Sequence, residues 1–194
     1  MKNGVDINMN RLRFVTSNKG KFYEVKSLLA DYEIEMFNVG YPEIQASDLE
    51  DVACYGIRYL WNEYGGNLFL EDSGLFIHKL NGFPGVFSSY AQNTIGNRGI
   101  LKLLSDEKDR RAYFKSVIAY CDEKGSIKLF GGRVDGFISY EEVGDEGFGF
   151  DPIFLYDGRT FGEISLDDKN KKSHRGFAVN EFKRYLDNNF KEVL

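Results

Sequence analysis

Residues 11–29 read RLRFVTSNKGKFYEVKSLL and contain the first strand, turn and helix that the sequence predicts. Residues 11–15 are rich in apolar side chains, which indicates a short strand, and the apolar positions of residues 22–29 fall on one face of a helix. Residues 16–20 between them are polar. The ordered part of the chain therefore begins with a strand, a polar turn and a helix, which are elements of an α/β domain.

The rest of the sequence continues this alternation around a β-rich middle. In chain order the hydrophobic pattern predicts a strand over residues 33–36, a helix over 49–64, strands over 67–70 and 75–80, a helix over 95–104, a hairpin of strands 112–121 and 127–134, a strand over 151–155 and a closing helix over 177–186. Strands that alternate with helices at both ends favour an α/β fold with a mixed central sheet flanked by helices. We expect a single domain over residues 11–194 and a frayed segment over residues 1–10.

The charge and cysteine content exclude several classes of protein. The 194 residues carry 30 acidic and 25 basic side chains, a net charge of -5, which argues against a protein that grips nucleic acid by its phosphates. The 2 cysteines form no CxxC pair and have no histidine at zinc-ligand spacing. No stretch is apolar enough to enter a membrane. These features predict a cytoplasmic protein that has neither a nucleic acid nor a membrane as partner.

The polar turn after the first strand is a candidate anion site. It consists of Thr16, Ser17, Asn18, Lys19, Gly20 and Lys21. A helix N-terminus presents unpaired N–H groups, and the hydroxyl, amide and ammonium groups here add further donors for a phosphate. In the alternative interpretation, Ser17 or Asn18 only caps the helix and the lysines are solvated.

Acidic residues form a second candidate site. Glu71 and Asp72 end an apolar run, and Glu43 follows Pro42 in another segment. Carboxylates are the ligands that Mg²⁺ prefers, so these acids could form a magnesium site. Neighbouring side chains of a strand point to opposite faces, so one cleft receives both Glu71 and Asp72 only if a turn redirects one of them. The sequence of residues 72–74, Asp-Ser-Gly, is also that of a simple tight turn.

Two segments mix glycine with aromatic residues. Residues 82–85, GFPG, are interpreted as a packed structural turn. In residues 147–154, GFGFDPIF, Gly149 lets the backbone approach a ligand closely, and Phe148 offers a flat face to a base. The alternative, a core position in a tight bend, remains open for Phe150 in particular.

A charged segment precedes the last helix. Residues 167–175 read DDKNKKSHR, and most such runs are solvated. We interpret Lys171 and Lys172 in that way, whereas Ser173, His174 and Arg175 place donors for a phosphate or a base carbonyl at a helix start.

These segments, taken in order, resemble the inosine triphosphate pyrophosphatase family, which hydrolyses ITP, dITP and XTP. The resemblance rests on TSNxxK at 16–21, Pro42-Glu43, EDSGL at 71–75, GFPG at 82–85, GFGFDP at 147–152 and SHR at 173–175, and it covers residues 11 to about 186. Residues 42–45 and 94–97 look most like archaeal members. The resemblance implies an elongated mixed sheet in two lobes with the active-site cleft between them, a homodimer, Mg²⁺ dependence and release of pyrophosphate.

The family resemblance also implies roles for individual residues. Glu43 and Asp72 would bind Mg²⁺, with Asp72 also the general base. The substrate would contact Thr16, Ser17, Asn18, Lys19, Gly20 and Lys21 at its phosphates, Ser73 nearby, and Phe148, Gly149, Phe150, Asp151, Lys169, His174 and Arg175 around the base or the adjoining phosphate.

One position departs from the family pattern. Many members carry a lysine in the second helix where this chain has Gly56, so either Arg58 substitutes for it or that phosphate contact is missing. Three alternative functions stay open: a Maf-like pyrophosphatase acting on other nucleotides, a non-catalytic nucleotide-binding protein, and an RNA-contacting module. The SHR and GFGFD segments argue against the first, the retained acids against the second, and the acidic balance against the third.

Overall fold

The computed structural model describes residues 11–190, and the segment predicted to be frayed, residues 1–10, lies outside this range. Its strands form one seven-stranded sheet in the order β2-β1-β3-β4-β5-β6-β7. The strands are β1 (Arg11–Val15), β2 (Glu33–Phe37), β3 (Leu68–Ile77), β4 (Arg111–Cys121), β5 (Ile127–Ile138), β6 (Phe154–Tyr156) and β7 (Arg159–Thr160). β1 pairs in parallel with β2 and β3, and all later pairs are antiparallel. The predicted α/β fold with a mixed sheet is confirmed.

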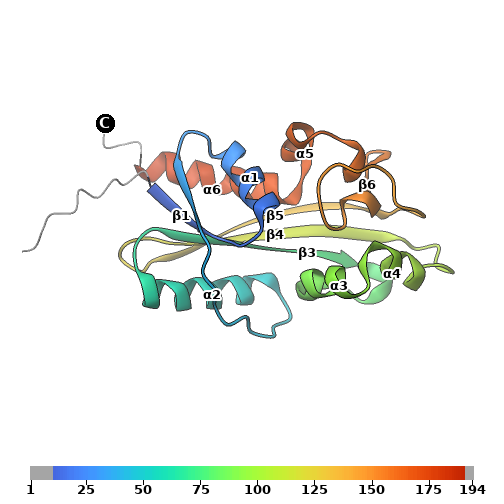
Figure 1. Cartoon of the computed structure of the whole chain (residues 1–194), viewed down its shortest axis with the longest axis horizontal. Coiled ribbons are helices and arrows are strands. Elements are labelled where there is room, and N and C mark those ends of the chain that lie inside the picture. The colour runs from blue at the N-terminus through green and yellow to red at the C-terminus, as the bar shows by residue number, and fades with distance from the viewer. Residues whose placement is uncertain (1–10, 191–194) are drawn as a thin grey trace, which may run out of the picture.

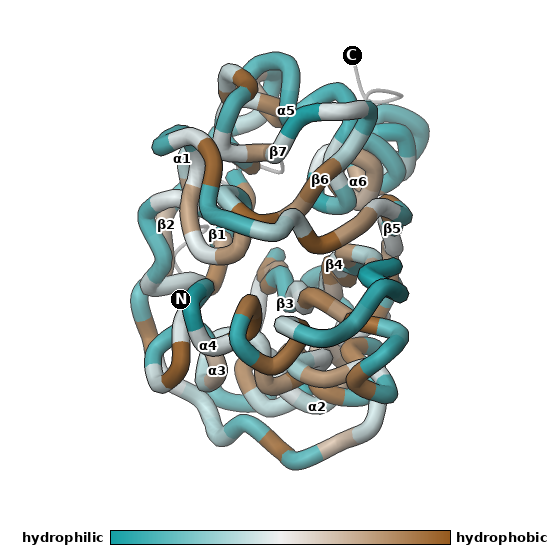
Figure 2. The backbone as a smooth tube through the Cα atoms, turned by 90° about the vertical axis from the view of Figure 1, so that its right-hand side faces the viewer, coloured by the Kyte–Doolittle hydropathy of each residue, from teal (hydrophilic) through white to brown (hydrophobic). Residues whose placement is uncertain are grey.

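Helices cover both faces of the sheet (Figures 1 and 2). On one face lie α1 (Lys19–Leu28), α5 (Leu166–Lys172) and α6 (His174–Phe190), and on the other lie α2 (Leu49–Tyr64), α3 (Ser88–Thr94) and α4 (Gly96–Leu103). The apolar face of α2 packs Ala53, Ile57 and Leu60 against Leu70 of β3. No helix within residues 11–190 is long and apolar enough to cross a membrane.

The long strands β3, β4 and β5 run through both lobes of the molecule. One lobe has its core around α1, α2 and α6, and the other has its core around α3, α4 and β6. Near one end of β3, Phe69 packs with Val25 and Phe182 under α1 and α6. Near the other end, Leu75 and Ile77 belong to a separate core at the far end of the sheet. Residues 71–74 of β3 therefore lie at the junction of the two lobes. They include polar residues and belong to neither core.

Residues 71–74 also show where the prediction was wrong. The sequence predicted two strands around a turn, but β3 is one strand whose residues from Leu68 to Ile77 all pair with β4. Gly74 has a role within this strand, because the loop that contains Gly85 packs closely against it. A Cβ on Gly74 would lie 2.3 Å from the Gly85 carbonyl oxygen. The strand thus needs glycine at this position for a close approach and not for a turn.

Other boundaries differ less. The structure adds α3 and α5, which the sequence did not predict, and α6 begins at His174 and not at residue 177. Residues Asp151–Ile153 form a 3-10 turn, so the strand predicted over 151–155 is reduced to β6, and His78–Leu80 likewise leave the sheet in a 3-10 turn. The short elements are set by contacts with the rest of the fold, which a local pattern does not contain.

Candidate active site

A cavity of about 750 Å³ lies at the junction of the lobes and gathers the predicted site residues. It is lined by Thr16, Ser17, Asn18, Lys21, Glu43, Asp72, Ser73, Phe148, Gly149, Phe150, Asp151, Lys169, His174 and Arg175. Lys19 and Gly20, which were also predicted, lie at the start of α1 but do not line it. The cavity therefore brings together residues that are up to 160 positions apart in the sequence, from Val15 to Arg175.

The loop between β1 and α1 is organised by its own side chains. Asn18 caps α1, because its Oδ1 accepts a hydrogen bond from the backbone N–H of Lys21 at 3.0 Å. Thr16 Oγ1 in turn accepts from the N–H of Asn18 at 3.1 Å. The capping interpretation of Asn18 is confirmed, while Ser17, Asn18 and Lys19 remain exposed at the helix N-terminus.

Glu71 lies on the α1 and α6 side of the sheet, where basic groups surround it. Its Oε2 is 2.8 Å from Lys21 Nζ, and its Oε1 is 3.2 Å from Arg175 Nε and accepts a hydrogen bond from Ser116 Oγ at 2.5 Å. Burial by itself raises the pKa of Glu71, but Arg175 and Lys21 together with the hydrogen bonds hold it below its ordinary value. Glu71 is therefore an ionised carboxylate that is already occupied by this protein's own cations.

Asp72, the next residue, has the opposite environment. Its Oδ2 is buried and has no hydrogen-bond partner within residues 11–190. Burial raises the pKa of Asp72 to about 6, Lys21 opposes that shift, and the negative charges of Glu71 and Glu43 add to it. Glu43 itself is exposed on the loop between β2 and α2. Asp72 and Glu43, which both line the cavity, thus give it a local negative charge.

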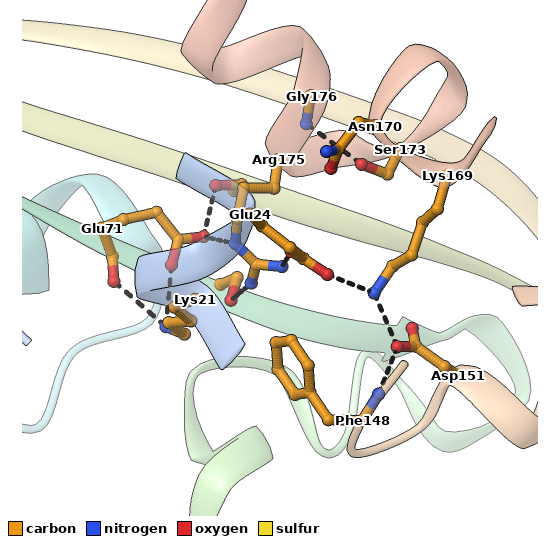
Figure 3. A network of polar contacts seen from close by, with 12 residues as sticks. Lys21, Glu24, Glu71, Phe148, Asp151, Lys169, Asn170, Ser173, Arg175 and Gly176 are labelled. Atoms are coloured by element: carbon orange, nitrogen blue, oxygen red, sulfur yellow. Dashed lines mark hydrogen bonds and ion pairs between the residues drawn. The ribbon is translucent and has the colours of Figure 1, made fainter. Parts of the chain in front are cut away.

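A buried network of alternating charges lies along one wall of the cavity (Figure 3). Glu24 of α1 bridges two bases: its Oε1 is 2.8 Å from Lys169 Nζ, and its Oε2 is 2.5 Å from Arg175 Nη1. Lys169 Nζ also lies 2.6 Å from Asp151 Oδ2. Together with the pair of Arg175 and Glu71, these contacts connect Lys21 at one end of the wall to Asp151 at the other.

The loop of residues 147–151 closes this wall. Asp151 Oδ2 accepts a hydrogen bond from the N–H of Phe148 at 2.7 Å, which holds the loop in place. The ring of Phe148 lies 4.8 Å from Lys169 Nζ and 5.4 Å from Arg175 Cζ, and a Cβ on Gly20 would meet the ring at 2.8 Å. Gly20 therefore leaves room for an aromatic ring above the start of α1. Phe150 belongs to the far core as well as to the cavity wall.

His174 is buried and neutral. Its ring stacks on Phe114 at a centroid distance of 4.5 Å. Burial and then the positive charge of Arg175 lower its pKa well below the ordinary value, so the imidazole carries no proton charge near neutral pH. Ser173, the residue before it, does not line the cavity, and its Oγ accepts a hydrogen bond from the N–H of Gly176 at the start of α6.

Gly56 and Arg58 resolve the departure from the family pattern. Arg58 lies on a different surface, beside Trp61 and Cys121, and does not line the cavity, which favours the second alternative, that the phosphate contact is missing. Gly56 is covered by the ring of Tyr41, whose Cε2 would lie 2.6 Å from a Cβ at that position. An aromatic ring thus fills the space next to the helix.

Among the residues that sequence reasoning missed, Tyr41 and Gln92 line the cavity, and Glu24 and Ser116 contact charged residues that line it. Only Glu24 had a signal: an acid next to Val25 on the apolar face of α1 requires a buried cation. Gln92 lies on α3 and its Nε2 donates to the carbonyl of Gly149 at 3.4 Å. Ser116 and Tyr41 enter through tertiary contacts that no local pattern marks.

Comparisons with known proteins agree with the geometry. The sequence profile described as the Ham1 family matches residues 12–185. The dITP/XTP pyrophosphatase of Thermococcus kodakarensis is 52% identical, over 93% of this chain and 100% of its own length, and that of Methanosarcina mazei is 48% identical, over 90% and 96%. Among solved structures, the Ham1 protein of Staphylococcus aureus has a TM-score of 0.80 at 29% identity, and that of Coxiella burnetii 0.80 at 31%, each covering 92% of this chain and 98% of the other. These relatives confirm the resemblance drawn from the motifs, including its archaeal character, and the chain belongs to the Ham1 family.

Proposed function

We propose that this protein hydrolyses non-standard purine nucleoside triphosphates, namely dITP, XTP and ITP, to the nucleoside monophosphate and pyrophosphate. The observation that carries the proposal is the cavity between the lobes, which combines an open helix N-terminus, an unpaired carboxylate at Asp72 and an aromatic ring beside cations. The relatives named dITP/XTP pyrophosphatase support the same substrates. Removal of such nucleotides would clear deaminated purines from the nucleotide pool.

The acidic residues of the cavity fit Mg²⁺. Asp72 has a buried oxygen without a hydrogen-bond partner within the described chain, and Glu43 is an exposed carboxylate on the same cavity. No cluster of three or more acidic, histidine or cysteine side chains suited to a metal occurs among residues 11–190, which agrees with an ion that takes its other ligands from water and phosphate. When bound, Mg²⁺ neutralises charge on the phosphate oxygens.

The protein's own residues perform the remaining steps. Asp72 accepts a proton from the attacking water, because one of its carboxylate oxygens is buried in the cavity without a hydrogen-bond partner within the described residues. Lys21 and the N–H groups at the start of α1 bind the phosphates and take up negative charge as pyrophosphate leaves. Lys19, which is exposed at the same helix end, adds a second cation there.

The other end of the cavity binds the base. Phe148 stacks on the purine, and Arg175 and Lys169 present N–H donors, held by Glu24 and Asp151. Hypoxanthine and xanthine carry a carbonyl at the 6 position, which accepts from these donors, whereas adenine carries an amino group. A buried donor that faces another donor is left unpaired, so adenine is disfavoured.

The protein is proposed to act as a homodimer in the cytoplasm. Phe83, Phe87, Tyr90 and Ile95 are exposed apolar residues in the segment from the 82–85 loop to the end of α3, where a second copy could cover them. Sedimentation of the purified protein tests this directly, because a dimer and a monomer of 22.2 kDa differ twofold in mass.

Activity is tested with purified protein and Mg²⁺ on ITP, dITP, XTP, ATP, GTP, UTP and dTTP, with pyrophosphate and orthophosphate assayed separately. We expect pyrophosphate as the first product and a preference for ITP, dITP and XTP. Orthophosphate as first product, or equal turnover of ATP and ITP, contradicts the proposal. Turnover of pyrimidine or modified nucleotides in preference to the 6-oxopurines indicates a Maf-like activity.

A further inference from the structure

Gln92 of α3 is a polar residue of the cavity that the proposed catalytic steps do not use. It is half-buried and lines the cavity together with Phe148 and Gly149. Its Nε2 donates to the Gly149 carbonyl at 3.4 Å, so the amide links α3 on one side of the sheet to the loop that carries Phe148. The side chain therefore stands beside the ring on which the purine is proposed to stack.

The orientation of the Gln92 amide follows from this contact. A carbonyl accepts hydrogen bonds, so the amide nitrogen and not the amide oxygen must face Gly149. The oxygen, Oε1, then points away from Gly149. It is buried and has no hydrogen-bond partner within residues 11–190. Buried acceptors in proteins are almost always paired, so an unpaired one inside a ligand cavity calls for a donor from the ligand.

The two basic residues at this end of the cavity do not donate a hydrogen bond to Gln92 Oε1. Arg175 and Lys169 are donors, and their partners are Glu24, Glu71, Ser73 and Asp151. Among the described residues, the base end thus offers donors from the α5 and α6 side and a buried, unpaired acceptor, Gln92 Oε1, from the α3 side. A 6-oxopurine has the complementary edge: a carbonyl acceptor at position 6 next to an N–H donor at position 1. Adenine has the reverse at both positions.

We propose that Gln92 is a specificity-determining residue whose Oε1 accepts a hydrogen bond from the N1–H of a 6-oxopurine. This inference rests on the proposed function and adds the second half of base recognition to it. Adenine would place its N1 lone pair against Oε1, which leaves two acceptors facing each other. Guanine also carries an N1–H, so Gln92 favours guanine and hypoxanthine alike.

The test combines a change in the protein with a change in the ligand. Inosine monophosphate and 1-methylinosine monophosphate differ only in whether N1 carries a proton or a methyl group. Their dissociation constants are measured by calorimetry, without catalysis, on the wild-type protein and on Gln92→Met, which keeps the side-chain length and removes the polar atoms. We expect the wild type to prefer inosine monophosphate by about tenfold or more, and Gln92→Met to bind both within about twofold.

Two further variants separate recognition from structure. Gln92→Glu retains an acceptor but loses the donor to Gly149, so it should keep a preference for inosine monophosphate even if overall affinity falls. If Gln92 only anchors the 147–151 loop, Met and Glu variants weaken both ligands equally, and the proposal is overturned. Thr94→Ala, on the same helix but outside the cavity, is the matched control and should keep the wild-type ratio.

The kinetic counterpart uses triphosphates. Gln92→Met should lower kcat/KM for ITP and GTP by about the same factor, tenfold or more, and change that for ATP by less than threefold. If Gln92→Met does not fold, the wild-type preference and the Glu variant still decide the matter, since equal binding of the two monophosphates by the wild type overturns the inference. A wild-type protein that releases no pyrophosphate from ITP contradicts the proposed function instead.

Discussion

Glu71 and Asp72 are consecutive residues of β3, yet the two faces of the sheet give their carboxylates opposite surroundings. On one face Lys21, Arg175 and Ser116 all contact Glu71, and its pKa is held low. On the other face Asp72 keeps a buried oxygen without a partner within the described residues, and its pKa is raised to about 6. The alternation of side chains along a strand separates the two charges.

This difference assigns different tasks to two chemically similar side chains. Glu71 is satisfied inside the protein, so it can position Lys21 and Arg175 but has no oxygen to spare for a ligand. Asp72 is unsatisfied, so the folded protein bears a cost that only a proton or a bound cation relieves. A catalytic carboxylate of this kind trades stability for activity.

The largest expected effect comes from Asp72→Asn. We expect kcat with ITP to fall by about a thousandfold or more, because the amide neither accepts the proton of water nor binds Mg²⁺ as a carboxylate does. The same change removes a buried charge, so the melting temperature of the metal-free protein should rise. Pyrophosphate assays and thermal unfolding measure the two effects. A variant with near-normal kcat would mean that Asp72 is not the catalytic base.

Glu71→Gln should destabilise the protein, in contrast to Asp72→Asn. It removes the charge shared by the half-buried Lys21 and the buried Arg175, which lowers the free energy of unfolding by about 3–5 kcal/mol. Urea denaturation measures the loss. Ser116→Ala is the control, because it removes one hydrogen bond to the same carboxylate and should cost about 1 kcal/mol. Equal losses of unfolding free energy in the two variants would show that the charge of Glu71 does not stabilise Lys21 and Arg175.

The two acids also predict opposite dependences on pH. The pKa of Asp72 rises from 3.8 to about 6 on folding, so its contribution favours folding below about pH 4 and is lost as the pH rises to 6. The stability gained by Asp72→Asn over the wild type should therefore grow between pH 4 and 7, to about 1–3 kcal/mol. The pKa of Glu71 is lowered, so its contribution is present above its ordinary value of 4.5 and is lost on acidification below it. Denaturation series of the metal-free proteins at each pH distinguish the two trends, and a constant difference between Asp72→Asn and wild type contradicts the first.

The smallest effect is expected from Arg58→Ala. Arg58 lies on α2, the helix that covers the Asp72 face, but next to Trp61 and Cys121 and away from the cavity. Turnover of ITP should therefore change by less than about twofold. A loss of tenfold or more in the turnover of ITP would place Arg58 at the phosphates after all.

Local patterns were sufficient for the elements that carry their own signals. Residues 49–64 were predicted as a helix with the bounds of α2, because an amphipathic period runs from Leu49 to a glycine stop at Gly65. Four residues of the loop at 16–21 and the acids at 43 and 72 line one cavity, whereas Lys19 and Gly20 of that loop do not. The prediction of two strands separated by residues 71–74 was wrong, since pairing with β4 keeps these residues in one strand.

The sequence by itself determined which chemical groups are present and their order along the chain, and this was enough for the fold class and the family. Only the tertiary structure decided which partner each charge takes. Glu24 and Arg175 are 151 positions apart and Glu71 and Ser116 are 45 apart, and hydrogen bonds and ion pairs of this kind depend on distances of a few Å that only the packed sheet and helices set. For this reason two adjacent acids that look equivalent in the sequence become a buried support and a reactive group in the folded protein.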